Sequence, residues 1–281
     1  MSNEEHDLVV RRILVALDAS PHSVAALEAA AELAARLQAE VLGLYVEDVN
    51  LLRLAELPFT KEVCLPTTAR RQLGVRDIER QFRAQAARMR RTLARHADRV
   101  HVRWSFQVSR GVISRELLTA AGEVDLISLG RAGRSVGEGG LGSTARVVCA
   151  EAPCLTLIMQ QGEHLSLPVM VVYDGSPLAQ KALAAATALI RGLDSHLIVF
   201  LLAAKTERAE AMKVQVSQWL RDRELIARYH VLAESSIHRL ARLTQMERGG
   251  TLVVPAESPL LRCEALIELL DKVQVPVLLV R

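Results

Sequence analysis

The chain contains one short motif twice, and this repetition limits the folds that it can adopt. An apolar run ends in Asp-x-Ser-Pro at residues 18–21, and an alanine-rich stretch follows it. The same order recurs with Asp-x-Ser-Pro at residues 174–177. Later in each half, the apolar segments Pro153–Leu157 and Pro276–Val280 also correspond. A pattern that repeats over this length indicates a tandem duplication of one domain.

The first copy alternates short apolar runs with segments of helical periodicity. Such alternation is typical of an α/β domain with a parallel sheet. Ser23 is the expected N-cap of the first helix, whose inward face is formed by Ala26, Ala30, Leu33 and Leu37. Strands are expected at residues 13–17, 41–46, 102–108, 126–129 and 153–159, and helices at residues 23–37, 76–98, 114–121 and 144–150.

An irregular excursion at residues 48–75, with a short expected helix at residues 51–57, has no counterpart in the second copy. A linker is expected at residues 160–164, so we place the two domains at residues 1–162 and 163–281. In the second copy, strands are expected at residues 169–173, 197–202, 227–232, 251–254 and 275–280, and helices at residues 178–193, 207–223, 236–246 and 260–272.

The composition suits a sheet covered by helices and argues against several classes of protein. Half of the residues are apolar but only 3% are aromatic, so Val, Leu, Ile and Ala must build the core. No apolar run approaches the roughly 20 residues of a membrane-spanning helix. The polar start is unlike a signal peptide, and the four cysteines form no Cys-x-x-Cys pair or Cys/His metal cluster. We therefore expect a cytoplasmic protein with reduced thiols and no membrane partner.

One segment, residues 76–103, is notably basic, with nine arginines against three acidic residues. A nucleic-acid surface is one interpretation. However, four apolar residues share one face of the expected helix, which leaves the arginines on the opposite, solvated face. These apolar residues are Ile78, Phe82, Met89 and Leu93. Because aromatic partners for base stacking are also lacking there, a solvated helix is favoured over a nucleic-acid partner.

Residues 126–143 join a short apolar strand to the start of a helix through a loop rich in glycine. Backbone N–H groups beside glycine can approach a phosphate closely, and a helix N-terminus adds partial positive charge. The loop is not a Walker A loop, since Gly-Lys-Ser/Thr is absent, nor a Gly-x-Gly-x-x-Gly motif after the first strand. The glycines alone are compatible with an anion cradle and equally with a flexible surface loop.

Together these motifs resemble the universal stress protein (UspA) family. The first copy carries the clearer match, with Gly130-x-x-Gly133, Gly142-Ser143 and the Ala-Pro-Cys segment that ends at Cys154. The resemblance implies two tandem Rossmann-like domains of the adenine nucleotide α-hydrolase-like kind, each an open, mostly parallel five-stranded sheet flanked by helices. The loop is one residue shorter than in the ATP-binding members, and its glycines still allow it to close around phosphates.

The resemblance also implies a site in the first copy for ATP or another adenine nucleotide, with Mg²⁺ as a possible companion. Asp18 would contact the nucleoside, and the backbone of Val46, at the end of the second strand, would face the adenine edge. Ribose and phosphates would be held by Gly130, Gly133, Gly142, Ser143 and Thr144. These positions follow strands whose carboxyl ends are the usual ligand edge of an open α/β sheet.

Several of these residues also have an interpretation without a ligand. Asp18 can cap a turn, and Val46 can be ordinary core. Gly130 can serve backbone geometry alone, and Ser143 can cap its helix. The nearby Arg131 and Arg134 could reach phosphates, although exposed loop arginines are more often solvated.

The second copy departs from the signature. Pro255 or Ala256 takes the position of Gly130, and no Gly-x-x-Gly or Gly-Ser follows. Proline removes a backbone donor that a phosphate would need. Although Asp174 and Ser176 remain, we expect the second copy to bind no nucleotide and to act as a structural partner.

Family members often dimerise through the last strand of the sheet, which would otherwise be a hydrophobic edge. Here residues 154–159 and 275–280 can make that contact within one chain, and the resulting pseudo-dimer can form a homodimer. The first functional hypothesis is a stress-response protein in which nucleotide occupancy biases a conformation that a protein partner reads. The second is a nucleotide-free scaffold for protein–protein interaction. An enzyme is the weaker hypothesis, with at most slow ATP cleavage, because no nucleophile–base group is expected at the strand ends.

Overall fold

The fold is taken from a computed structural model of the protein, in which nearly every element expected from the sequence is present. The structure describes residues 9–57, 61–63, 70–72, 74–132, 140–160, 162–191, 193, 196–232, 237–247, 249–258 and 263–281. The elements of the first half are β1 (Arg12–Ala16), α1 (Pro21–Leu37), β2 (Glu40–Asp48), α2 (Val49–Glu56), β3 (Lys61–Val63), β4 (Arg70–Gln72), α3 (Val75–Arg99), β5 (Trp104–Gly111), α4 (Ile113–Ala121), β6 (Leu126–Gly130), α5 (Ser143–Glu151) and β7 (Leu155–Met159).

The second half repeats this order without the excursion, as expected. Its elements are β8 (Val169–Tyr173), α6 (Pro177–Ile190), β9 (Leu197–Leu202), α7 (Thr206–Arg221), β10 (Ala227–Leu232), α8 (Ile237–Met246), β11 (Thr251–Pro255), α9 (Cys263–Lys272) and β12 (Val277–Val280). The boundary that we propose at residue 162 falls between β7 and β8.

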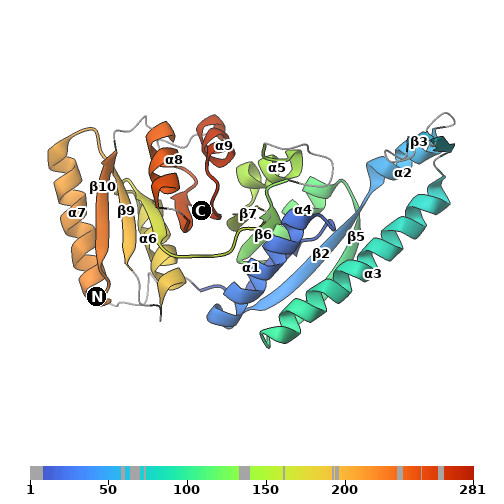
Figure 1. The fold of residues 1–281 in the computed structure, drawn as a ribbon, viewed down its shortest axis with the longest axis horizontal. Helices are drawn as coiled ribbons and strands as arrows, with labels where there is room; N and C mark the ends of the chain where they lie inside the picture. The colour runs from blue at the N-terminus through green and yellow to red at the C-terminus, as the bar shows by residue number, and fades with distance from the viewer. Residues whose placement is uncertain are drawn as a thin grey trace.

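One sheet runs through both halves in the order β10-β9-β8-β11-β12-β7-β6-β1-β2-β5 (Figure 1). Within each half the strands are parallel, and the two halves meet where β7 pairs antiparallel with β12. Leu157 lies opposite Leu278, and Ile158 lies opposite Val277. The pairing of the two final strands expected from the sequence is therefore present, and it covers both hydrophobic edges.

Helices cover both faces of the sheet and bury an aliphatic core on each. Helices α1, α3, α6 and α7 pack on one face, and α4, α5, α8 and α9 pack on the other. Strands β7, β8, β9 and β11 are buried along their whole length, which explains why they read as continuous apolar runs rather than alternating ones. None of the helices in the described part of the chain is long and apolar enough to cross a membrane.

The start of α1 differs from the sequence prediction. The N-cap is Ser20, whose hydroxyl accepts a hydrogen bond from the backbone N–H of Ser23 at 3.1 Å. Pro21 opens the helix, because its missing N–H is not needed in the first turn. Ser23 as the N-cap was therefore wrong by one turn, whereas the inward face holds, with Ala26 and Ala30 fully buried.

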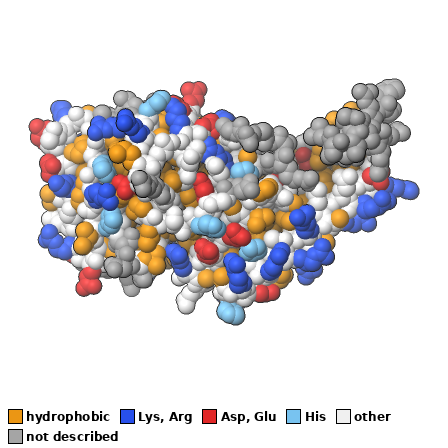
Figure 2. Space-filling model, viewed as in Figure 1, with side chains coloured by type: hydrophobic (Ala, Val, Ile, Leu, Met, Phe, Trp, Pro, Cys, Tyr) orange, Lys and Arg blue, Asp and Glu red, His pale blue; other side chains and the backbone are white. Residues whose placement is uncertain are grey.

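The excursion contains a pair of strands that the sequence prediction lacks. Strands β3 and β4 form a two-stranded antiparallel sheet between α2 and α3. Helix α3 has the amphipathic form that the pattern predicts, because Ile78, Phe82, Met89 and Leu93 are all buried. Its arginines are exposed and gather along the lower right edge of the molecule in Figure 2.

Candidate functional site

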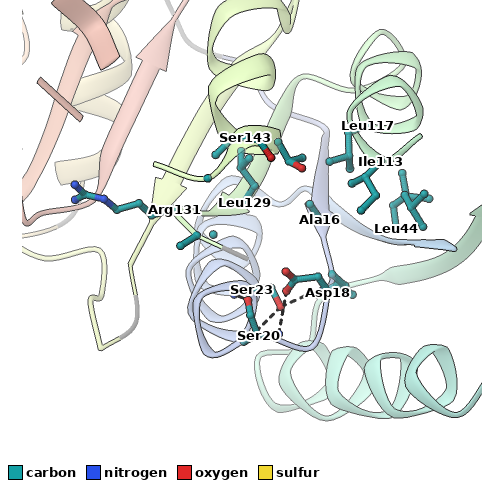
Figure 3. Close-up of a pocket in the computed structure, with 17 residues that line it drawn as sticks. Ala16, Asp18, Ser20, Ser23, Leu44, Ile113, Leu117, Leu129, Arg131 and Ser143 are labelled. Atoms are coloured by element: carbon teal, nitrogen blue, oxygen red, sulfur yellow. Dashed lines mark hydrogen bonds between the residues drawn. The ribbon is translucent and has the colours of Figure 1, made fainter. Parts of the chain in front are cut away.

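A pocket of about 160 Å³ opens at the carboxyl ends of β1 and β6 in the first half (Figure 3). Strand order reverses at this point, since β2 follows β1 on one side and β6 lies on the other. Such switch points are the usual ligand sites of open α/β sheets. The pocket is lined by Ala16, Leu17, Asp18, Ser20, Ser23, Leu44, Val46, Ile113, Leu117, Leu129, Gly130, Arg131, Ala132, Gly142, Ser143, Thr144 and Ala145.

The structure brings six of the seven predicted site residues together in this pocket. They are Asp18, Val46, Gly130, Gly142, Ser143 and Thr144. The seventh, Gly133, lies outside the described residues, as does Arg134.

Asp18 forms a tight turn between β1 and α1. Its Oδ1 accepts a hydrogen bond from the backbone N–H of Ser20 at 2.9 Å, and Ala19 between them has a φ of 63°. Asp174 makes the same bond to Ser176 at 2.9 Å in the second half. Asp18 and Asp174 therefore both cap the turn that follows their strand. A ligand contact by Asp18 would be additional to that role.

Val46 lies inside β2 rather than at its end, because the strand continues to Asp48. Strand β1 ends opposite Leu44, two residues before Val46, so β1 does not cover the backbone of Val46. On the other side, Val46 pairs with Ser109 of β5. The backbone of Val46 thus lies beside the pocket on the side that β1 does not cover, where it can contact the edge of a planar ligand.

Gly130 ends β6 where the strand passes very close to the first turn of α1. A Cβ atom at this position would lie 2.7 Å from the Cβ of His22 and 3.0 Å from the backbone nitrogen of Ser23. Real Cβ atoms do not approach so closely, so only glycine fits without a shift. The interpretation of Gly130 through backbone geometry is therefore supported.

The N-terminus of α5 points its first turn into the pocket. Gly142 is the N-cap and forms no side-chain cap, and Ser143 is the first helical residue. Ser143 is exposed and does not cap the helix, so the capping interpretation of this residue was wrong. No side chain among the described residues caps this turn, and the turn contains no acidic residue, so it is suited to an anion.

Arg131 points away from the pocket, contrary to both sequence interpretations of this residue (Figure 3). Its guanidinium donates to the backbone carbonyls of Asp271 and Val273 at the end of α9, each at 2.7 Å. Burial lowers the pKa of Arg131, and the carboxylates of Asp271 and Glu163 partly restore it. The half-buried side chain is therefore a bridge between the halves and is not directed at a phosphate.

The apolar wall of the pocket was missed by the sequence prediction. It is formed by Ala16, Leu44, Ile113, Leu117 and Leu129. A signal was available, because the repeat aligns Ala16 and Leu44 with the larger residues Val172 and Phe200 of the second half. Both larger residues are fully buried.

The second half has lost the equivalent features. Pairing with β8 aligns Thr251 of β11 with Leu126 of β6, so Pro255 rather than Ala256 takes the place of Gly130. Pro255 is buried and has no N–H to offer. Val172 and Phe200 also replace the smaller Ala16 and Leu44 that line the first-half pocket.

Comparison with known proteins links the whole arrangement to one family. The model of the Universal stress protein family matches residues 10–160, which is more than half of the chain. A universal stress protein from Archaeoglobus fulgidus DSM 4304 is similar in fold, with a TM-score of 0.73 and 15% identity, covering 95% of this chain and 97% of that chain. A chain from Pseudomonas aeruginosa UCBPP-PA14, described as a universal stress protein, gives a TM-score of 0.60 and 14% identity, with coverages of 96% and 92%.

A universal stress protein in complex with cAMP also matches, with a TM-score of 0.40 and 18% identity, covering 55% of this chain and 100% of that chain. No match was found among curated proteins. Similarities to solved structures at these identities establish the fold, and the family follows from the match to residues 10–160.

Proposed function

Because this chain belongs to the universal stress protein family, we propose that it is a stress-response protein whose first half binds ATP or another adenine nucleotide. Occupancy of the pocket would bias a conformation that a protein partner reads. Mg²⁺ would accompany the phosphates in the usual way, bound mainly by the nucleotide.

One observation carries this proposal, namely the meeting of an apolar wall and a free helix N-terminus in the same pocket. Ala16 and Leu44 lie on the apolar side, and Gly142 and Ser143 lie on the polar side. An adenine base needs a flat apolar slot, and a phosphate needs N–H donors such as those of a helix N-terminus. A nucleotide is the common ligand class that combines both requirements in one molecule.

The test is ATP binding by a variant that fills the apolar side of the pocket. Ala16→Leu adds bulk where Ala16 lines the cavity, and we expect it to abolish or strongly weaken ATP binding measured by equilibrium dialysis. Ala87→Leu, at an exposed site on α3, is the matched control and should bind like the wild type. Equal ATP affinity of wild type and Ala16→Leu would exclude this pocket as the site, provided that thermal unfolding shows both variants folded.

A second candidate function is a nucleotide-free scaffold for protein–protein interaction. It is favoured by α2 and its end, where Leu51, Leu54 and Leu57 are 42%, 47% and 55% exposed. Apolar side chains that cluster on a surface are typical of contact sites. Mass spectrometry of the supernatant after heat denaturation separates the two functions, because an adenine nucleotide released from purified protein would count against a nucleotide-free scaffold.

We also propose that the protein works in the cytoplasm as a homodimer. Cytoplasmic ATP would supply the ligand, and Cys149 and Cys154, which are free thiols in the structure, would stay reduced there. The outer edge strands β5 and β10 are the available surfaces for pairing between chains. Sedimentation equilibrium gives the mass directly, and a monomer at micromolar concentration would contradict the dimer.

A further inference from the structure

The second half reaches into the base of the glycine-rich loop through one carboxylate. Asp271 in the last turn of α9 accepts a hydrogen bond from the backbone N–H of Leu141 at 2.8 Å through Oδ1. Its Oδ2 lies 3.2 Å from Nη2 of Arg146 on α5. The Nε of Arg146 in turn donates to the carbonyl of Leu141 at 2.9 Å. Leu141 and α5 are thereby joined to the second half immediately before the helix N-terminus that faces the pocket.

The other end of the loop is held to the same turn of α9. Arg131 donates to the carbonyls of Asp271 and Val273, and its own carbonyl accepts from the N–H of Gly142 at 2.8 Å. The N–H of Arg131 donates to the carbonyl of Met159 on β7 at 2.7 Å. Arg131 before the loop and Gly142 after it are therefore bonded to each other, and Arg131 and Leu141 are both bonded to the end of α9.

Helix α5 is also held at its C-terminus by the second half. The guanidinium of Arg281, the residue after β12, donates to the carbonyls of Cys149 and Ala152. A cation at this end of a helix satisfies carbonyls that have no partner within the helix. The orientation of α5, and with it the direction of its N–H groups, thus depends on contacts made by the second half.

We propose that Asp271 is a positioning residue through which the second half sets the nucleotide affinity of the first-half pocket, an inference that rests on the function proposed above. Asp271 does not line the pocket and acts through Leu141 and Arg146. If Asp271 already holds Leu141 and the start of α5 in place, the protein loses less conformational entropy when a phosphate binds there. By linkage, a nucleotide that needs this ordered base stabilises the contact between α9 and α5 to the same degree.

Charge and geometry make opposite predictions for Asp271, which allows a sharp test. A negative charge near the phosphates would weaken binding, so its removal would tighten binding if charge dominated. The Asp271 and Arg146 side chains are 32% and 42% exposed, so solvent screens their charges and the geometric effect should prevail. Asp271→Asn keeps an oxygen acceptor for Leu141, whereas Asp271→Ala removes it.

Hydrogen–deuterium exchange of the nucleotide-free protein tests the contact by itself. Asp271→Ala should speed exchange in peptides that cover residues 140–146, and Asp271→Asn should leave most of the protection in place. Asp222→Ala is the matched control, since Asp222 is an exposed carboxylate at the end of α7, another helix of the second half. Unchanged exchange in Asp271→Ala would overturn the proposal whatever the ligand.

Calorimetric titration with MgATP tests the effect on the pocket. We expect Asp271→Ala to weaken ATP binding about fivefold or more, while Asp271→Asn and Asp222→Ala stay close to wild type. In the wild type, ATP should also slow exchange at the end of α9. Unchanged or tighter binding by Asp271→Ala would overturn the proposal. If the wild type itself binds no ATP, the proposed function fails, and the exchange measurement still decides whether Asp271 holds the loop.

Discussion

A Cβ atom at Gly130 would lie 2.7 Å from the Cβ of His22, so the packing of β6 against the first turn of α1 leaves no room for a side chain at position 130. Gly130→Ala should therefore force β6 and the first turn of α1 apart beside the pocket. We expect a loss of about 1–3 kcal/mol in the free energy of unfolding, measured by urea denaturation, together with weaker ATP binding.

Gly140→Ala is the control for this substitution. A Cβ at Gly140 meets nothing within 4 Å, so its effect on stability should stay within about 0.5 kcal/mol. Equal losses for the two alanine variants would show that the close approach at Gly130 does not matter.

Ser20 and Ser176 cap α1 and α6 in the same way, each accepting a bond at 3.1 Å from an N–H of the first turn. Replacing either serine by alanine should cost about 1 kcal/mol of unfolding free energy, because one N–H loses its partner. Ser143→Ala should cost much less, since Ser143 is exposed and no side chain caps α5. Thermal unfolding of the three variants checks this order. A loss in Ser143→Ala as large as in the other two would contradict it.

The turn after β1 stores backbone strain that the turn after β8 avoids. Ala19 has a φ of 63°, and glycine occupies the equivalent position, with a φ of 83° at Gly175. Gly175→Ala should destabilise the protein by about 1–2 kcal/mol, because a side chain is disfavoured in this conformation. Ala19→Gly relieves such strain but frees the unfolded chain, so it should change stability by less than about 1 kcal/mol. Chemical denaturation of both variants compares the two turns, and a stable Gly175→Ala would refute the assignment of strain.

The thiols of Cys149 and Cys154 should resist modification in the folded protein. Burial raises the pKa of Cys149 to about 12 and that of Cys154 to about 11. At pH 8 almost none of either thiol is the reactive thiolate. A thiol reagent should therefore label both residues only after denaturation, as peptide mass spectrometry can show. Rapid labelling of either residue in the native state would contradict their burial.

The same pKa shifts predict the sign of a stability change at alkaline pH. In the unfolded chain the two thiols release protons from about pH 8.5 upward, whereas the folded protein keeps them bound. The unfolded state then binds fewer protons, so stability falls as the pH rises between about 8.5 and the folded pKa values. Cys149→Ala should reduce the slope of unfolding free energy against pH, and an unchanged slope would count against this cause.

The sequence was sufficient for the strands of the ten-stranded sheet and for the strand ends at which the pocket lies, because both depend on local patterns. Continuous apolar runs followed by Asp18 or Gly130 mark strands whose ends meet at one edge of a parallel sheet. The choice between Pro255 and Ala256 needed the register of β11 with β8, which aligns Thr251 with Leu126.

The missed features depend on contacts between distant residues or on details of one turn. Two partners of Arg131, the carbonyls of Asp271 and Val273, lie at the end of α9, and nothing in the local sequence of Arg131 indicates this bridge to the second half. Ser23 was preferred to Ser20 as the N-cap because the helical pattern is clear only beyond Pro21. The pair β3–β4 is short and lies in a segment without periodicity, so no pattern predicts it.

Isothermal titration of MgATP into the wild-type chain tests the central claim most directly, because the duplicated halves make stoichiometry as informative as affinity. We predict one site per chain, since the second half has Pro255, Val172 and Phe200 where the first-half pocket has Gly130, Ala16 and Leu44. Two sites per chain, or no binding at millimolar ATP, would contradict the account.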